Sequence, residues 1–160
     1  MNIRSSWLFF LIITTFLGVP AQAQQAPEFT LVDADGNQVS LADYRGKALI
    51  LHFWATWCPY CERLQPGLES LYQDFQADGL EVLGINFLDK ADAEPQKVLR
   101  ERGLTFKTAI DGDEVASLYG VQGTPTTFFI TRDGAVLWVT NNSDPNDPRF
   151  EDAVDYLLNH

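Results

Sequence analysis

The sequence predicts an α/β fold, in which a mixed central sheet is flanked by helices. An apolar run over residues 48–54 is typical of a strand buried on both faces of a sheet. Apolar residues at three- and four-residue spacings follow this run, as in an amphipathic helix. Nearer the C-terminus, two apolar runs flank Arg132-Asp133-Gly134, which indicates a hairpin. Strands that are joined first through helices and then through a tight turn form a mixed sheet with helices on both faces.

The other elements follow from the same patterns. Two short extended runs around an Asp/Gly/Asn cluster at residues 33–37 predict an extra N-terminal β-hairpin. The helix after residue 61 should be kinked by Pro66 and end at Asp78-Gly79. Strands are expected over residues 28–32, 38–41, 48–54, 81–88, 105–110, 126–131 and 135–140, further helices over 91–102, 113–119 and 147–158, and a short turn or helix over 41–44.

Residues 1–23 are typical of a signal peptide. Arg4 precedes an apolar run from Trp7 to Val19, and Ala21-Gln22-Ala23 offers a cleavage site of small residues. We expect cleavage after Ala23, which leaves residues 24–160 as one soluble domain in the periplasm or another exported compartment. An uncleaved N-terminal membrane anchor is the alternative. Export would place the protein where disulfides persist.

The chain is acidic, with 22 acidic and 11 basic residues and a formal net charge of −11. This charge argues against binding to nucleic acid or to anionic membrane surfaces, and it favours basic partners. Solubility alone explains the charge equally well.

The two cysteines of the chain, Cys58 and Cys61, lie between the apolar run and the helix that follows it. A Cys-x-x-Cys at a helix start indicates a redox dithiol, and two thiolates are too few for a four-ligand zinc site, so no metal is expected. The helix N-terminus stabilises a thiolate on Cys58, so its pKa should fall below about 8.5. Pro59 suits the first helical position. We expect Cys58 to form the mixed disulfide and Cys61 to resolve it. A static disulfide or a pair of core cysteines is the alternative, although a disulfide that closes so small a loop constrains the unfolded chain little.

The chain resembles the TlpA-like branch of the thioredoxin superfamily, which comprises exported thiol–disulfide oxidoreductases of the ResA and CcmG/DsbE types. The resemblance implies a thioredoxin fold over residues 24–160, a redox-active pair that needs no cofactor, and a role such as cytochrome c biogenesis. It is carried by four segments: Leu41-Ala42-Asp43-Tyr44-Arg45-Gly46-Lys47, Phe53-Trp54-Ala55-Thr56-Trp57-Cys58-Pro59-Tyr60-Cys61, Val82-Leu83-Gly84-Ile85-Asn86, and Tyr119-Gly120-Val121-Gln122-Gly123-Thr124-Pro125-Thr126-Thr127-Phe128-Phe129-Ile130.

The same resemblance implies roles for residues around the dithiol. Thr124-Pro125 corresponds to the cis-proline turn of the superfamily, where the Thr124 backbone can pair with an extended substrate. Trp57 precedes Cys58, and Pro59 and Tyr60 lie between the cysteines; all three are expected to support the active site. His52 occupies the position of the buried Asp of thioredoxin, and it could accept the Cys61 proton or, if protonated, stabilise a thiolate. A core histidine without a catalytic role is the alternative.

Asp89 falls where several TlpA-like reductases carry a Glu, so it is a second possible proton acceptor. A solvated loop carboxylate is the alternative. The Pro59-Tyr60 pair between the cysteines is familiar from glutaredoxins, and this dipeptide helps to set the reduction potential within a range of about −270 to −120 mV.

These observations predict a monomeric thiol–disulfide oxidoreductase that reduces disulfides in specific client proteins, such as an apocytochrome c or a copper-site protein. A membrane or periplasmic thiol donor would return it to the dithiol form. A disulfide-forming or isomerising enzyme is one alternative, and a Cu(I)-binding thiol chaperone is another. A peroxiredoxin is disfavoured because Ala55 stands where the peroxiredoxin pattern needs Thr.

Overall fold

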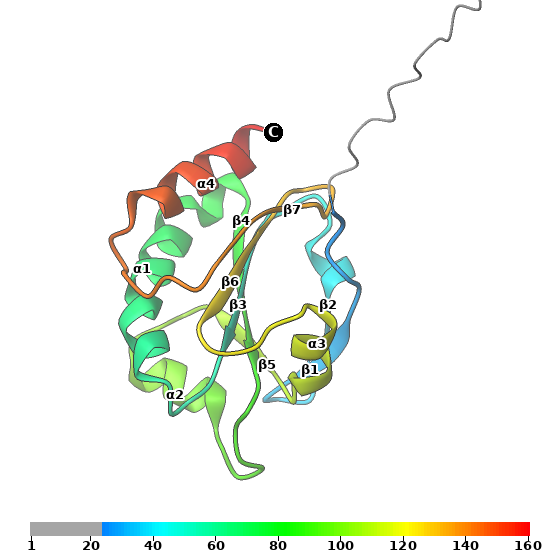
Figure 1. Cartoon of the computed structure of the whole chain (residues 1–160), viewed down its shortest axis with the longest axis vertical. Helices are drawn as coiled ribbons and strands as arrows, with labels where there is room; N and C mark the ends of the chain where they lie inside the picture. Colours follow the sequence, from blue (N-terminus) through cyan, green and yellow to red (C-terminus); the bar gives the residue numbers. More distant parts are fainter. Residues whose placement is uncertain (1–23) are drawn as a thin grey trace, which may run out of the picture.

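The computed structural model describes residues 24–160, which form a seven-stranded sheet flanked by helices (Figure 1). The strand order is β2-β1-β5-β4-β3-β6-β7. Strand β4 pairs in parallel with β3 and β5, whereas β6 pairs antiparallel with β3. The predicted mixed α/β sheet is therefore confirmed. The predicted signal peptide, residues 1–23, lies outside the described residues.

The elements follow the predicted order. The strands are β1 (Thr30–Asp33), β2 (Gln38–Ser40), β3 (Ala48–Trp54), β4 (Leu80–Asn86), β5 (Lys107–Ile110), β6 (Thr126–Ile130) and β7 (Val136–Thr140). The helices are α1 (Pro59–Phe75), α2 (Pro95–Glu101), α3 (Asp113–Leu118) and α4 (Pro148–Asn159), and two short 3-10 helices are η1 (Leu41–Tyr44) and η2 (Gln76–Asp78).

Strand β3 forms the centre of the sheet, and all seven of its residues are buried. Alternate side chains enter two separate cores because successive residues of a strand point to opposite faces. Ile50 and Trp54 join the core beneath α1, α2 and α4, and Leu51 and Phe53 join the core beneath α3 and the N-terminal hairpin. Figure 1 shows α1, α2 and α4 on one face of the sheet and α3 on the other.

The N-terminal hairpin extends the sheet, because β1 pairs antiparallel with both β2 and β5. Its turn is closed by the Asp33 side chain, whose Oδ1 accepts hydrogen bonds from the backbone N–H groups of Asp35 and Asn37 at 2.9 and 2.8 Å. A short polar side chain that bonds to its own turn is a common reason for Asp at this position. The predicted extra hairpin is confirmed.

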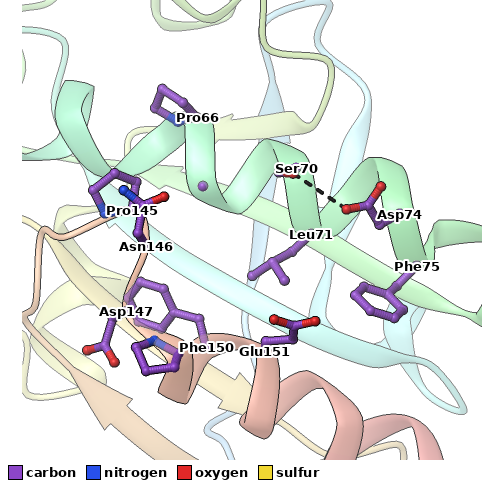
Figure 2. A pocket seen from close by; sticks show the side chains of 12 residues that line it. Pro66, Ser70, Leu71, Asp74, Phe75, Pro145, Asn146, Asp147, Phe150 and Glu151 are labelled. Atoms are coloured by element: carbon purple, nitrogen blue, oxygen red, sulfur yellow. Dashed lines mark hydrogen bonds between the residues drawn. The ribbon is translucent and has the colours of Figure 1, made fainter.

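The predicted start of one helix was wrong. Helix α2 begins at Pro95 rather than at residue 91, because a proline suits the first turn of a helix, and residues 91–94 form a turn followed by an irregular stretch. Helix α1 continues through Pro66 to Phe75. Figure 2 shows Pro66 on α1 near Pro145 of the segment before α4. A hollow of about 590 Å³ lies between these elements, and neither cysteine lines it.

Candidate active site

The dithiol motif joins the carboxyl end of β3 to the start of α1. Cys58 is the N-cap residue of α1, with extended backbone, and its Sγ accepts a hydrogen bond from the backbone N–H of Cys61 at 3.1 Å. Pro59 occupies the first helical turn, as predicted. Cys58 and Cys61 form a disulfide whose Cα atoms are 5.3 Å apart. The structure is therefore that of the oxidised protein.

The two cysteines are almost equally buried, with 2% of Cys58 and 0% of Cys61 exposed. Burial therefore does not show which cysteine attacks and which resolves. The position of each sulfur relative to the start of α1 does distinguish them. The Cys58 sulfur accepts from the N–H of Cys61, which lies in the first turn of α1 and has no partner within the helix, and this N–H favours a thiolate. The assignment of Cys58 as the attacking sulfur and Cys61 as the resolving one remains our prediction.

Aromatic side chains flank the disulfide at the surface. Trp57 is 60% exposed and Tyr60 is 54% exposed, although both rings are large and apolar. The Trp57 indole donates a hydrogen bond to the Leu88 carbonyl oxygen at 2.9 Å, which fixes the ring across the loop after β4. Trp54, by contrast, is fully buried and donates to Thr108 Oγ1 at 3.0 Å. The two tryptophans therefore differ in role, since only Trp57 can touch a partner molecule.

The Thr124–Pro125 peptide bond is cis, as predicted. The proline turn and the dithiol motif meet at a hollow of about 330 Å³, which is lined by Tyr60, Gly123, Thr124, Pro125, Asn141 and Ser143. Asn141 braces this turn, because its side-chain amide donates to the Pro125 carbonyl oxygen at 3.0 Å and to Thr126 Oγ1 at 2.7 Å. No sequence pattern indicates a role for Asn141, which lies just after β7.

His52 lies fully buried on β3, on the same face as Trp54. Its Nδ1 is 3.0 Å from Thr127 Oγ1 on β6, and no hydrogen bond joins it to a cysteine within residues 24–160. Burial lowers the pKa of His52 to about 3, so the ring is neutral near pH 7. A neutral ring cannot stabilise a thiolate by charge. The role of His52 as the acceptor of the Cys61 proton remains a prediction.

Asp89 is bound to the turn that precedes Cys58. Its Oδ2 accepts from the Thr56 backbone N–H and its Oδ1 from the Thr56 hydroxyl, each at 2.8 Å. The Asn86 amide also donates to Oδ2, at 2.6 Å. Asp89 is thus a structural partner of the active-site turn rather than a freely solvated loop carboxylate. Its proposed role as a proton acceptor stays a prediction.

The part of the chain that the structure describes contains no cluster of three or more His, Cys, Asp or Glu residues that could hold a metal ion. Within the same residues, no helix is both long enough and apolar enough to cross a membrane.

A cysteine pair at this place in a thioredoxin-like sheet can pass between dithiol and disulfide, and electrons then move to or from the thiols of other molecules. The protein is therefore a thiol–disulfide oxidoreductase. The chain belongs to the AhpC/TSA family, which matches residues 23–139 and lies within the thioredoxin superfamily.

Curated relatives and solved structures agree with this assignment. The thiol-disulfide oxidoreductase ResA of Geobacillus thermodenitrificans is 42% identical over 117 residues, which cover 72% of this chain and 67% of ResA. The ResA protein of Bacillus thuringiensis subsp. konkukian is 36% identical over 115 residues, 71% of this chain and 66% of its own. The matches thus span about two thirds of these relatives. A crystal structure from Chlorobium tepidum, described as a DsbE thiol:disulfide interchange protein, has a TM-score of 0.76 at 32% identity and covers 85% of this chain and 96% of its own.

Proposed function

We propose that the protein is an exported reductase that delivers electrons to a disulfide in a specific client protein. The observation that carries the proposal is the N-cap position of Cys58, whose sulfur accepts a hydrogen bond from the N–H of Cys61. Tyr60, which lies between the two cysteines, lines a hollow together with Pro125. The direction of electron flow is proposed from the resemblance to the TlpA-like branch. Maturation of a c-type cytochrome is the role we infer for this client.

The reaction begins with the reduced protein. The Cys58 thiolate attacks one sulfur of the client disulfide, forms a Cys58–client disulfide and releases the other client sulfur as a thiolate, which takes up a proton. Cys61 then loses its proton and attacks the Cys58 sulfur. The Cys58–Cys61 disulfide forms, and the first client sulfur leaves as a second thiol. Two electrons have moved from the protein to the client. A thiol donor must then supply two further electrons to reduce the Cys58–Cys61 disulfide, and the donor is oxidised to a disulfide.

The chain's own residues would position the client during this exchange. The Thr124 backbone, next to the cis bond, would pair with an extended segment of the client, while Tyr60 and Pro125 would border that segment. Trp57 would contact it from the other side of the motif. We further propose that residues 1–23 direct export and are removed after Ala23, and that the remaining chain acts as a monomer.

The reduction potential of the Cys58–Cys61 pair tests the direction. Equilibration against a redox buffer should give a value near the thioredoxin end, about −270 mV, whereas a value near the DsbA end, about −120 mV, would overturn the reductase proposal. The variant Cys61→Ser should accumulate a mixed disulfide with a disulfide-bearing client peptide. Cys58→Ser, the matched control, should trap none.

A further inference from the structure

Arg102 contacts the active-site turn and the helix that follows it at the same time. It is the C-cap residue of α2, and 18% of its side chain is exposed. Its Nη2 donates to the Thr56 carbonyl oxygen at 3.0 Å, and its Nη1 donates to Gln65 Oε1 at 2.8 Å. The guanidinium also lies over the Trp54 ring, with Cζ 5.9 Å from the ring centroid.

The two acceptors of Arg102 bracket the disulfide along the chain. Thr56 lies two residues before Cys58, and Gln65 lies one helical turn after Cys61, so both cysteines fall between them. Gln65 is fully buried, and its Oε1 depends on Arg102 for a hydrogen bond. A planar guanidinium has donors on separate nitrogens and can hold two such acceptors at fixed positions, which a lysine ammonium does less well.

Charged groups near the dithiol give Arg102 a second effect. Glu62 is in the first turn of α1, where its negative charge opposes a thiolate on Cys58, and its Oε2 is 3.5 Å from Arg102 Nη2. Arg63 is exposed and lies over the Tyr60 ring at 5.2 Å, Asp89 binds the far side of Thr56, and His52 is neutral. Arg102 is thus a permanent, partly buried positive charge that offsets Glu62.

We propose that Arg102 is a positioning residue of the redox pair, which holds the Thr56 turn against α1 and favours the Cys58 thiolate. A group that stabilises the thiolate stabilises the reduced protein, and it raises the reduction potential. This effect holds for either direction of electron flow, so it does not depend on the proposed reductase role.

The test is the variant Arg102→Met in the otherwise complete protein, with Arg100→Met as the control. Arg100 lies on the same helix and is exposed. In Arg102→Met the pKa of the Cys58 thiol, measured from the pH dependence of its alkylation, should rise by roughly half to one unit, which is less than a directly adjacent charge produces. The equilibrium with a glutathione buffer should shift by about threefold to tenfold towards the disulfide. Arg100→Met should change neither quantity.

A purely structural role predicts a different result. Arg102→Met would then lower the free energy of unfolding but leave the thiol pKa and the redox equilibrium at their wild-type values, and that outcome overturns the proposal. Arg102→Lys keeps the charge. In this variant the pKa of the Cys58 thiol should lie close to its wild-type value, even if the free energy of unfolding does not. If Arg102→Met does not fold, Arg102→Gln provides the same comparison, because glutamine removes the charge but keeps a polar side chain at this partly buried position.

Discussion

The Asp89 carboxylate accepts hydrogen bonds from both the backbone N–H and the hydroxyl of Thr56, each at 2.8 Å. This pair joins the loop after β4 to the turn that leads into Cys58. Because Arg102 binds the carbonyl oxygen of the same residue, all three polar groups of Thr56 are used. The turn is therefore held from two sides, by a carboxylate and by a guanidinium.

We expect Asp89→Ala to lower the free energy of unfolding by about 1 to 3 kcal/mol, because the Thr56 N–H and the Asn86 amide both lose a charged acceptor. Urea denaturation of the oxidised protein measures the change. Asp92→Ala, at an exposed position nearby, should have almost no effect. Equal effects of the two substitutions would contradict the role of Asp89 in holding the turn.

Asp89→Asn separates this structural role from proton transfer. The amide oxygen can still accept one hydrogen bond from Thr56, but it cannot take up the Cys61 proton near neutral pH. We expect the pH profile of mixed-disulfide resolution to change in this variant if Asp89 is the proton acceptor that the sequence predicts. An unchanged profile would confine Asp89 to positioning the turn.

His52 should make the protein less stable in mild acid. Its pKa is lowered from 6.5 to about 3 in the folded protein, so the unfolded chain binds one more proton between these values, and stability is lost as the pH falls from about 6.5. Below pH ~6, the free energy of unfolding should fall by about 1.4 kcal/mol for each pH unit. Carboxylates such as Asp43, whose pKa lies below its usual value of 3.8, act only at lower pH.

The comparison for His52 is the variant His52→Asn, which does not titrate and places its amide near the position of Nδ1, the ring atom beside Thr127. Between pH ~6.5 and ~4.5 its free energy of unfolding should change much less with pH than that of the wild-type protein. Parallel pH curves for the two proteins would show that the buried imidazole is protonated as readily as in the unfolded chain.

Local sequence patterns predicted the strands, helices and caps whose residues are neighbours along the chain. The bounds of β3 agree with its apolar run, and Asp147, whose Oδ1 accepts from the Arg149 N–H at 3.0 Å, caps α4 next to a proline. The contacts of Arg102 could not be predicted in this way. Thr56 and Gln65 are 46 and 37 residues from it, and only the packing of α2 beside α1 brings them together.

The contact of Asn141 with the Pro125 turn could not be predicted from the sequence, for the same reason as the contacts of Arg102. Asn141 follows β7, and its contact with the Pro125 turn exists only because β6 and β7 pair antiparallel. Polar residues in loops show no periodicity, so sequence patterns cannot separate such contacts from solvated side chains.

Gly84→Ala should disrupt the middle of the sheet beneath the active site. A Cβ atom on Gly84 would lie 2.7 Å from Trp54 Nε1 and 2.8 Å from Thr108 Oγ1, where these two atoms now form a hydrogen bond. We expect a loss of about 1 to 3 kcal/mol in the free energy of unfolding, as for other overpacked cores. Gly123→Ala is the control, since a Cβ there meets nothing within 4 Å. Similar stability of both variants would mean that the core around Trp54 is loosely packed.

The segment that follows the predicted cleavage site is part of the fold. Val136 N–H donates to the Gln24 carbonyl oxygen at 2.8 Å, Ala26 N–H donates to the Gly134 carbonyl oxygen at 2.9 Å, and Ala26 is 3% exposed. These contacts lie at the β6–β7 turn. Ile130, at the end of β6 nearest this turn, pairs with Leu49 near the start of β3, whereas the disulfide follows the end of β3.

A protein that begins at Pro27 should therefore be less stable than one that begins at Gln24, by about 1 to 3 kcal/mol, because two backbone hydrogen bonds and a buried methyl group are lost. Its Cys58–Cys61 redox equilibrium should be unchanged, since the lost contacts lie at the opposite end of β3 from the disulfide. Urea denaturation and glutathione equilibration of the two proteins measure both quantities, with Gln25→Ala as a control that keeps the backbone intact. A shift in the redox equilibrium together with stability would mean that this N-terminal segment influences the active site through the sheet.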